Sequence, residues 1–260
     1  MSINYEAFVH RIDKSQIPAC NIMGVNIAAI DMDWLLQFTF RNIRELSGDY
    51  CCVSNVHTTV MAWEDRDYCA IQNGGALAIP DGGPLSTVGQ RRGHMGMRRT
   101  TGPDYMREVL CTGISKGYRH FFYGSTEETL GKIRERLTAE YPHLQIAGMY
   151  APPFRTLEKE EDLQVTRMIN ESNADFVWVG LGAPRQEIWM AQHQGKMKGF
   201  MVGVGAGFDY LAGNIDRAPR WMQEHNLEWL YRLWQDPGRL WKRYMKTNMK
   251  FIWNAYLLGR

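Results

Sequence analysis

The chain has 260 residues, 45% of them hydrophobic and 22% charged, with a formal net charge of +2. These values are typical of a globular protein with enough apolar material for one large domain or two small ones. No stretch of the sequence approaches the roughly 20 apolar residues that a membrane-spanning helix needs, and outside the last 44 residues the charge balance predicts no broad basic surface for nucleic acid. Because the first residues hold no apolar run of signal-peptide length, we expect a protein that is not exported.

The charges are unevenly distributed. Residues 217–260 contain nine Lys or Arg, three Asp or Glu, and five of the nine tryptophans. The remainder contains 21 basic and 25 acidic residues. We therefore expect a mildly acidic domain over residues 1–216 and a basic, aromatic appendage over residues 217–260. The five cysteines form no CxxC pair, which favours a reducing compartment over disulfides or zinc.

Short apolar runs alternate with longer amphipathic segments. The runs are rich in β-branched and aromatic residues, which is typical of strands buried on both faces. They lie at residues 21–27, 50–56, 76–79, 120–123, 176–179 and 200–204. Helical segments with cap signals lie at residues 31–47, 125–141, 157–173 and 184–194. This order predicts an α/β fold with a mainly parallel, doubly wound (Rossmann-like) sheet.

A single acidic residue follows the third apolar run. Asp81 stands between Pro80 and Gly82. Ligands of open α/β sheets bind at the carboxyl ends of the strands, so Asp81 could be a general base aimed at a substrate hydroxyl. The alternative is a turn residue, because Pro-Asp-Gly is common turn chemistry.

Other strand ends carry features of a small-ligand crevice. Asn55, Gly182 and Gly205 each follow an apolar run. Backbone N–H groups at the helix start after Gly182 can receive a phosphate, although a simple strand–helix connection would look the same. Arginines at positions 91, 92, 98 and 99 could neutralise a diphosphate or form a solvated face.

Two Asp-x-Asp pairs raise the possibility of metal-dependent sugar transfer. The pair at Asp31 and Asp33 reads better as a helix cap with an acidic first turn. The pair at Asp65 and Asp67 reads better as surface in the middle of a helix. We therefore expect no metal and no cofactor.

The appendage reads as two helices, residues 217–235 and 239–258, separated by Pro237-Gly238. On a helical projection its basic residues from 239 to 250 fall within an arc of about 100°. Apolar and aromatic residues, Trp241 and Met249 among them, occupy the opposite side. This pattern favours a helix lying in an anionic membrane surface; the alternative is a helix that packs on the body or on another subunit.

Together, seven ordered motifs resemble those of the WecG/TagA/CpsF family of bacterial glycosyltransferases (glycosyltransferase family 26). The resemblance covers about residues 21–243. The motifs lie at residues 55–57, 80–82, 99–104, 182–187, 205–209, 217–219 and 227–233. Arg185 stands where family members usually carry lysine.

The resemblance implies an inverting, metal-independent transferase that acts in surface polysaccharide biosynthesis. Its donor would be a UDP-sugar carrying N-acetylmannosamine, its uronic acid or glucose, and its acceptor a polyprenyl-diphosphate-linked saccharide. It would work in the cytoplasm as a peripheral protein on the inner face of the bacterial plasma membrane. The sequence does not decide among the sugars and leaves self-association open. A nucleotide- or sugar-binding protein that docks on membranes without chemistry is the alternative.

The resemblance also implies roles for individual residues. Asp81 would be the catalytic base, with Arg99 near the diphosphate and Gln186 near the nucleotide. The remaining substrate-binding positions would be Asn55, His57, Gly82, Gly102, Asp104, Gly182, Glu187, Gly205 and Asp209. The lipid-linked diphosphate would meet Arg217, Arg232, Arg239 and a third basic residue of the appendage, for which Arg243 is preferred over Lys242.

Overall fold

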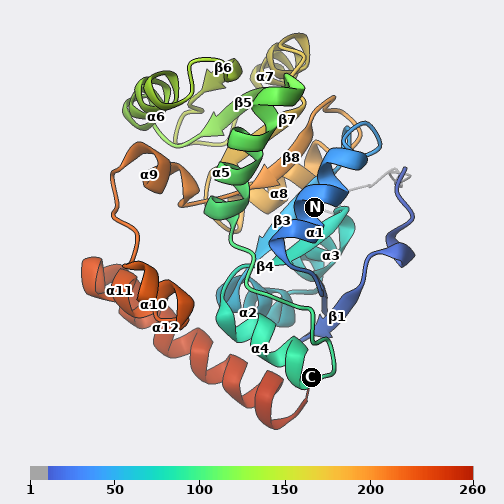
Figure 1. Ribbon diagram of the computed structural model, residues 1–260, viewed down its shortest axis with the longest axis vertical. Helices are drawn as coiled ribbons and strands as arrows, with labels where there is room; N and C mark the ends of the chain where they lie inside the picture. The colour runs from blue at the N-terminus through green and yellow to red at the C-terminus, as the bar shows by residue number, and fades with distance from the viewer. Residues whose placement is uncertain (1–10, 260) are drawn as a thin grey trace.

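The computed structural model describes residues 11–259, apart from the side chains of Arg239 and Arg243. A six-stranded parallel sheet with strand order β4-β3-β8-β7-β5-β6 forms its centre (Figure 1). The strands are β3 (Tyr50–Ser54), β4 (Leu77–Pro80), β5 (Arg119–Gly124), β6 (Gln145–Tyr150), β7 (Phe176–Gly180) and β8 (Phe200–Gly203). The predicted doubly wound α/β class is confirmed.

Two layers of helices cover the sheet because alternate residues of each strand face opposite sides. Cys52 of β3 packs into one core, whereas Cys51 and Val53 pack into the other. One layer contains α2 (Val56–Glu64), α3 (Arg66–Gly74), α4 (Gly83–Arg91), α7 (Lys159–Glu171) and α8 (Arg185–Gln192). The other contains α1 (Met32–Arg41), α5 (Gly102–Gly113), α6 (Glu127–Glu140) and α9 (Gly207–Ala212).

Two parts of the sheet prediction were wrong. Residues 21–27 are no parallel strand but part of an antiparallel hairpin, β1 (Ala19–Ile22) and β2 (Val25–Ala28). Its turn residues, Met23 and Gly24, have φ values of 51° and 89°, the left-handed pair that tight hairpins require. Strand β6 was missed because it is a half-exposed edge strand without the continuous apolar run of a buried one.

The first residue of each Asp-x-Asp pair caps a helix, but only the first of these caps was predicted. The Asp31 carboxylate accepts a hydrogen bond from the Trp34 N–H at 2.9 Å, so the predicted cap of α1 is confirmed, although α1 ends at Arg41. Asp65 accepts hydrogen bonds from the first N–H groups of α3. Its predicted place in the middle of a helix was wrong, because it separates two helices.

The appendage folds as α10 (Arg220–Glu224), α11 (Glu228–Gln235) and α12 (Pro237–Phe251), followed by a wider turn over Ile252–Leu257. The predicted first helix is divided near Asn226, whose φ is 59°. Pro237 begins α12 instead of ending a helix. In the described chain, no helix has the length and apolarity needed to cross a bilayer.

Helix α12 runs along one edge of the molecule, next to α2 (Figure 1). Leu240 and Phe251 are each 1% exposed and Ala255 is also buried, so one face of the helix packs on the body. Trp241 and Met249, on the predicted apolar face, are 57% and 65% exposed. The packing interpretation therefore holds for one face, and a second apolar face remains uncovered.

Candidate active site

The carboxyl ends of three adjacent strands form the centre of the candidate site. Asn55 follows β3, Asp81 follows β4 and Gly205 lies just after β8. Strand β3 lies between β4, which follows it in the chain and forms the edge of the sheet, and β8, which comes from the second half of the chain. Such a change in strand order is where open α/β sheets bind ligands.

Asp81 is held in place by the strand beside it and by the turn that follows it. Its N–H donates to the Ser54 carbonyl at 2.7 Å, and Gly82 takes a φ of 114° that an L-residue with a side chain rarely adopts. The Asn55 Oδ1 accepts from the N–H groups of His57 and Thr58 at 3.0 and 3.2 Å. This cap leaves the Asn55 amide group to hydrogen-bond the Asp81 carboxylate.

Burial raises the pKa of Asp81 to about 6. Removing a carboxylate from water disfavours its charged form. The positive charge of Arg99 lowers the pKa of Asp81, the negative charge of Glu228 raises it, and the positive charge of Arg232 lowers it further. A carboxylate with a pKa near neutrality can accept a proton and still be mostly ionised at pH 7.

The appendage returns to this site through its charged residues. Glu228, at the start of α11, pairs with Arg99, and both side chains are less than one-fifth exposed. A second Glu228 oxygen faces the Arg217 Nε at 3.6 Å. Arg217 also pairs with Asp104, to which the Thr101 hydroxyl donates at 2.6 Å. One carboxylate of the appendage thus lies between two arginines beside the Asp81 loop.

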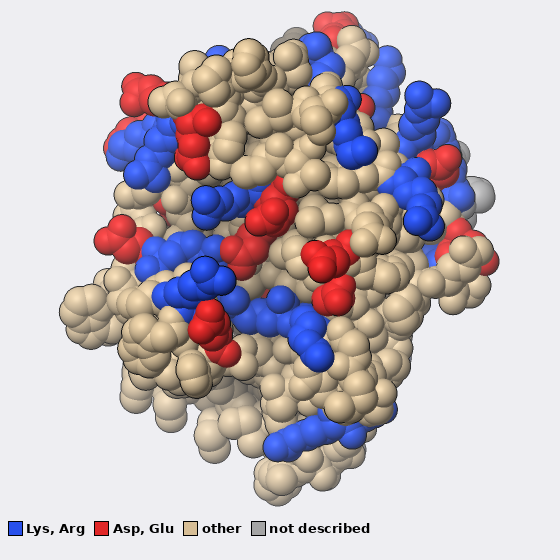
Figure 2. All heavy atoms as spheres, in the orientation of Figure 1, with Lys and Arg blue, Asp and Glu red and all other residues tan. Residues whose placement is uncertain are grey.

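The turn before α11 lies directly on the Asp81 loop. A methyl group at Gly83 would collide with the side chain of Asn226, so the two segments are in close contact. Figure 2 shows acidic and basic side chains side by side across the middle of this face. The residues predicted to line a small-ligand crevice thus form a mixed-charge site that the appendage covers on one side, and this site is called the crevice.

A second group of predicted residues forms a buried polar network behind the crevice. The Gln186 Oε1 accepts from the Gly182 N–H at 3.2 Å, and its Nε2 donates to Glu187 at 2.8 Å and to the Gly203 carbonyl at 3.2 Å. Burial raises the pKa of Glu187. Gln186 thus shapes the glycine turns after β7 and β8 with all of its polar atoms.

The network reaches β3 through two further side chains. Tyr68 lies against Glu187 and accepts from Gln72 at 2.9 Å. The Ser54 hydroxyl donates to Gln72 at 2.6 Å. Because Ser54 precedes Asn55, this chain of hydrogen bonds connects the glycine turns to the loops that hold Asp81.

Other predicted residues lie at the edges of this arrangement. Gly102 is buried against Val53. Asp209, on α9, accepts from Asn214 at 3.3 Å, and Asn214 in turn donates to Thr129 of α6. The Asp209 carboxylate is thus linked to α6 through Asn214. The side chains of Arg239 and Arg243 lie outside the described residues.

Two residues of the crevice were not predicted as site residues. Tyr210, on α9, lies beneath Arg217 and Arg232, whose guanidinium carbons are each 5.6 Å from its ring centroid. Glu228 pairs with the predicted Arg99. Glu228 lies within the motif at residues 227–233, and Tyr210 directly follows the motif at residues 205–209. Their closeness to these motifs was the signal in the sequence that could have identified them.

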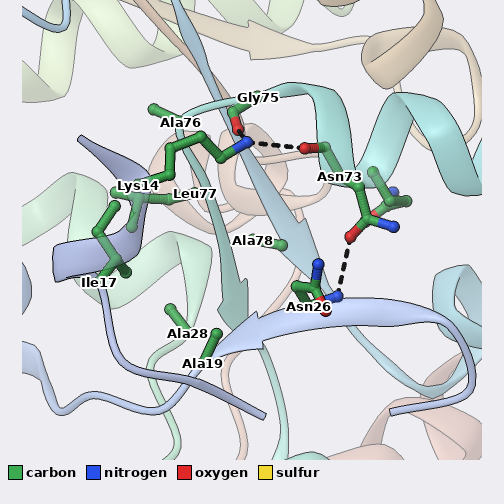
Figure 3. Close-up of a pocket in the computed structure, with 11 residues that line it drawn as sticks. Lys14, Ile17, Ala19, Asn26, Ala28, Asn73, Gly75, Ala76, Leu77 and Ala78 are labelled. Carbon is green, nitrogen blue, oxygen red and sulfur yellow. Dashed lines mark hydrogen bonds between the residues drawn. The ribbon is translucent and has the colours of Figure 1, made fainter. Parts of the chain in front are cut away.

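A separate cavity of about 140 Å³ lies at the opposite end of β4 (Figure 3). There Lys14 donates to the carbonyls of Asn73 and Gly75, and the Asn73 side chain accepts from the Asn26 N–H at 2.8 Å. Burial lowers the pKa of Lys14. These groups bond to one another, so they attach the amino-terminal segment to the sheet edge, far along β4 from Asp81.

In the described residues no three His, Cys, Asp or Glu side chains are placed so that they could hold a metal ion. The positive charge near Asp81 comes from Arg99, Arg217 and Arg232. The arrangement can therefore take a proton at Asp81 and stabilise an anion beside it with guanidinium groups.

Comparison with known proteins gives one consistent result. The family model described as "Glycosyl transferase WecG/TagA/CpsF family" matches residues 20–259. An N-acetylglucosaminyldiphosphoundecaprenol N-acetyl-beta-D-mannosaminyltransferase of Bacillus subtilis is 33% identical over 193 residues, 73% of this chain and 72% of the relative. Proteins of the same name from Bacillus spizizenii and Staphylococcus aureus are 30% and 26% identical, covering 75% and 88% of this chain and 74% and 90% of theirs.

We predict that the Asp81 carboxyl titrates near pH 6. Its folded pKa exceeds the ordinary value of 3.8, so the protonated form is favoured by folding. Its contribution to the free energy of unfolding is fully present below about pH 4 and is lost as the pH rises through 6. Carbon-13 NMR of aspartate-labelled protein, assigned with Asp81→Asn, measures the midpoint. Glu228→Gln should lower it, and a wild-type midpoint near 4 would contradict the burial argument.

Proposed function

The chain belongs to the WecG/TagA/CpsF family of glycosyl transferases, and we propose that it transfers N-acetylmannosamine from a UDP-sugar to a lipid-linked acceptor. The acceptor is N-acetylglucosamine on undecaprenyl diphosphate, and the product enters surface polysaccharide synthesis. The names of the three relatives support this choice of sugar and acceptor over the uronic acid and glucose. The observation that carries the chemistry is a half-buried carboxylate, Asp81, beside Arg99.

In the proposed reaction Asp81 takes the proton from an acceptor hydroxyl as that oxygen attacks the anomeric carbon. The new carbon–oxygen bond forms on the face opposite the leaving group. The bond to the UDP oxygen breaks, and its electron pair leaves with the diphosphate. One displacement of this kind inverts the anomeric centre. A positioned base of this type contributes about 10²- to 10⁴-fold in rate.

The departing diphosphate needs positive charge that is already in place. Arg99, Arg217 and Arg232 supply it as guanidinium groups, which bind phosphate oxygens in pairs. Glu228 is the acceptor for Arg99 and faces the Arg217 Nε at 3.6 Å, whereas Asp104 is the acceptor for the other Arg217 nitrogens. We infer that phosphate oxygens replace the Glu228 carboxylate when substrate binds, which keeps the charges in the crevice balanced.

The uncovered apolar face of the appendage supports docking at the inner face of the plasma membrane. Trp234, Trp241 and Met249 are between 57% and 76% exposed, and Lys242 and Lys246 are exposed on the same segment. Apolar side chains beside basic ones suit the boundary of an anionic bilayer. We propose residues 217–260 as the membrane-docking and acceptor-binding part, and residues 1–216 as the donor-binding and catalytic part.

Replacement of the base tests the reaction. Asp81→Asn should lower kcat by about 10²- to 10⁴-fold and leave the Kd of the UDP-sugar within about threefold, because the amide keeps the shape of the loop. Release of UDP from UDP-N-acetylmannosamine, with and without a short-chain diphosphate-linked N-acetylglucosamine acceptor, is the measurement.

The matched control is Asp33→Asn, an exposed residue in the first turn of α1, which should leave turnover unchanged. Normal turnover of Asp81→Asn would rule out Asp81 as the base. If wild-type protein binds the UDP-sugar but never releases UDP in the presence of acceptor, the binding-only alternative holds. A loss of activity in Asp33→Asn that added Mn²⁺ restores would favour a metal-dependent mechanism.

Charge placed on the uncovered face tests membrane docking. The double variant Trp241→Glu, Met249→Glu should lose most of its binding to vesicles containing about one-third phosphatidylglycerol, because it removes apolar contact and adds repulsion. Wild-type binding should weaken as salt rises, since the Debye length is about 8 Å at physiological ionic strength. Phe154→Glu, at an 83% exposed position outside the appendage, is the control in flotation assays. Equal binding of both variants would refute the membrane face.

A further inference from the structure

Two buried donors in the crevice have no acceptor. The hydroxyl of Tyr210 is shielded from solvent and has no hydrogen-bond partner within the described part of the chain. The Nε of Arg217 is also buried and has no hydrogen-bond partner in the described residues, because the nearest Glu228 oxygen is 3.6 Å away. A buried donor without an acceptor is costly, so these two groups are suited to an acceptor supplied by a bound molecule.

The groups around the Tyr210 hydroxyl define the chemistry of the missing acceptor. Arg217 and Arg232 both lie against the Tyr210 ring, and a guanidinium can only donate hydrogen bonds. Burial raises the pKa of Tyr210 to about 12, so its hydroxyl remains a donor at any physiological pH. In the described residues the Tyr210 hydroxyl and the Arg217 Nε have no acceptor, and the Arg232 guanidinium lies beside them. This arrangement fits an anion with several oxygens.

The two carboxylates nearby do not fill this role. Asp81 and Glu228 both interact electrostatically with Tyr210, yet neither accepts a hydrogen bond from its hydroxyl. Glu228 is already paired with Arg99. The Asp81 carboxylate accepts a hydrogen bond from the Asn55 amide, and the proposed reaction needs Asp81 as a base. Neither carboxylate is therefore the acceptor of the Tyr210 hydroxyl, and a substrate phosphate has the chemistry that fits.

We propose that the Tyr210 hydroxyl, together with Arg217 and Arg232, binds a phosphate oxygen of a substrate diphosphate. This inference rests on the proposed function and adds a binding residue to it. The diphosphate belongs either to the nucleotide sugar or to the lipid-linked acceptor. Both have the same phosphate chemistry, and the experiment separates them.

Tyr210→Phe is the variant that tests this role. It removes only the hydroxyl and keeps the ring on which the two arginines lie. A hydrogen bond to a charged group is lost, so the Kd of inorganic diphosphate, measured by calorimetry, should rise about tenfold or more. The melting temperature should stay level or rise, because an unsatisfied buried hydroxyl is removed. Tyr118→Phe, whose hydroxyl lies 3.4 Å from the Phe40 carbonyl, is the control and should not change the Kd.

Two further measurements assign the diphosphate. A rise of about tenfold in the Kd of UDP, with the acceptor KM unchanged, assigns the hydroxyl to the nucleotide. The same rise in the acceptor KM, with the Kd of UDP unchanged, assigns it to the lipid-linked substrate.

The inference is overturned if Tyr210→Phe leaves all three constants at wild-type values, or if it lowers the melting temperature and kcat without changing any of them. The proposed function fails separately. If wild-type protein shows no acceptor-dependent UDP release but binds diphosphate more tightly than Tyr210→Phe, the phosphate site stands and the reaction does not.

Discussion

The ion pair between Arg99 and Glu228 joins the two parts of this molecule. The arginine follows the Asp81 loop and the glutamate begins α11, so the pair closes the appendage over the end of the sheet. Exposed ion pairs contribute little to stability, but these side chains are 19% and 15% exposed, and the same carboxylate faces Arg217. Removing one partner of such a pair leaves a poorly hydrated, unpaired charge behind, so breaking the pair destabilises the protein.

This closure also determines the chemistry that the crevice can perform. Covering Asp81 raises its pKa toward neutrality, which suits a base. The same covering brings Arg217 and Arg232 to the site, which is the fixed positive charge that the proposed reaction needs for its leaving group. Glu228 and Asp104 pair with Arg99 and Arg217 and hold these arginines in place. In the described residues, two buried donors of this site, the Tyr210 hydroxyl and the Arg217 Nε, have no hydrogen-bond partner.

Most of the central sheet could be predicted from the sequence because buried parallel strands are continuous apolar runs, and five of them were identified. Strand β6 was missed because half-exposed edge strands lack that run, and the hairpin at Met23-Gly24 was missed because its turn lies inside one. The place of Asp81 at the carboxyl end of the sheet followed from its position directly after an apolar run. Tyr210 and Glu228 were not chosen, because their places depend on how the appendage folds back over residues far away in the chain.

Hydrogen exchange of the Glu228→Gln variant tests the closure of the appendage most directly. Loss of the negative charge should make the amides of α10 and α11 exchange at least about tenfold faster than in wild-type protein, since charged hydrogen bonds contribute about 1.5–3 kcal/mol. Amides of β3 and β8 should not change, and Glu128→Gln, which breaks an exposed pair with Lys132, should have no effect on α10 and α11. Unchanged exchange in α10 and α11 of Glu228→Gln would contradict the account, because the appendage would then be held over Asp81 by other contacts.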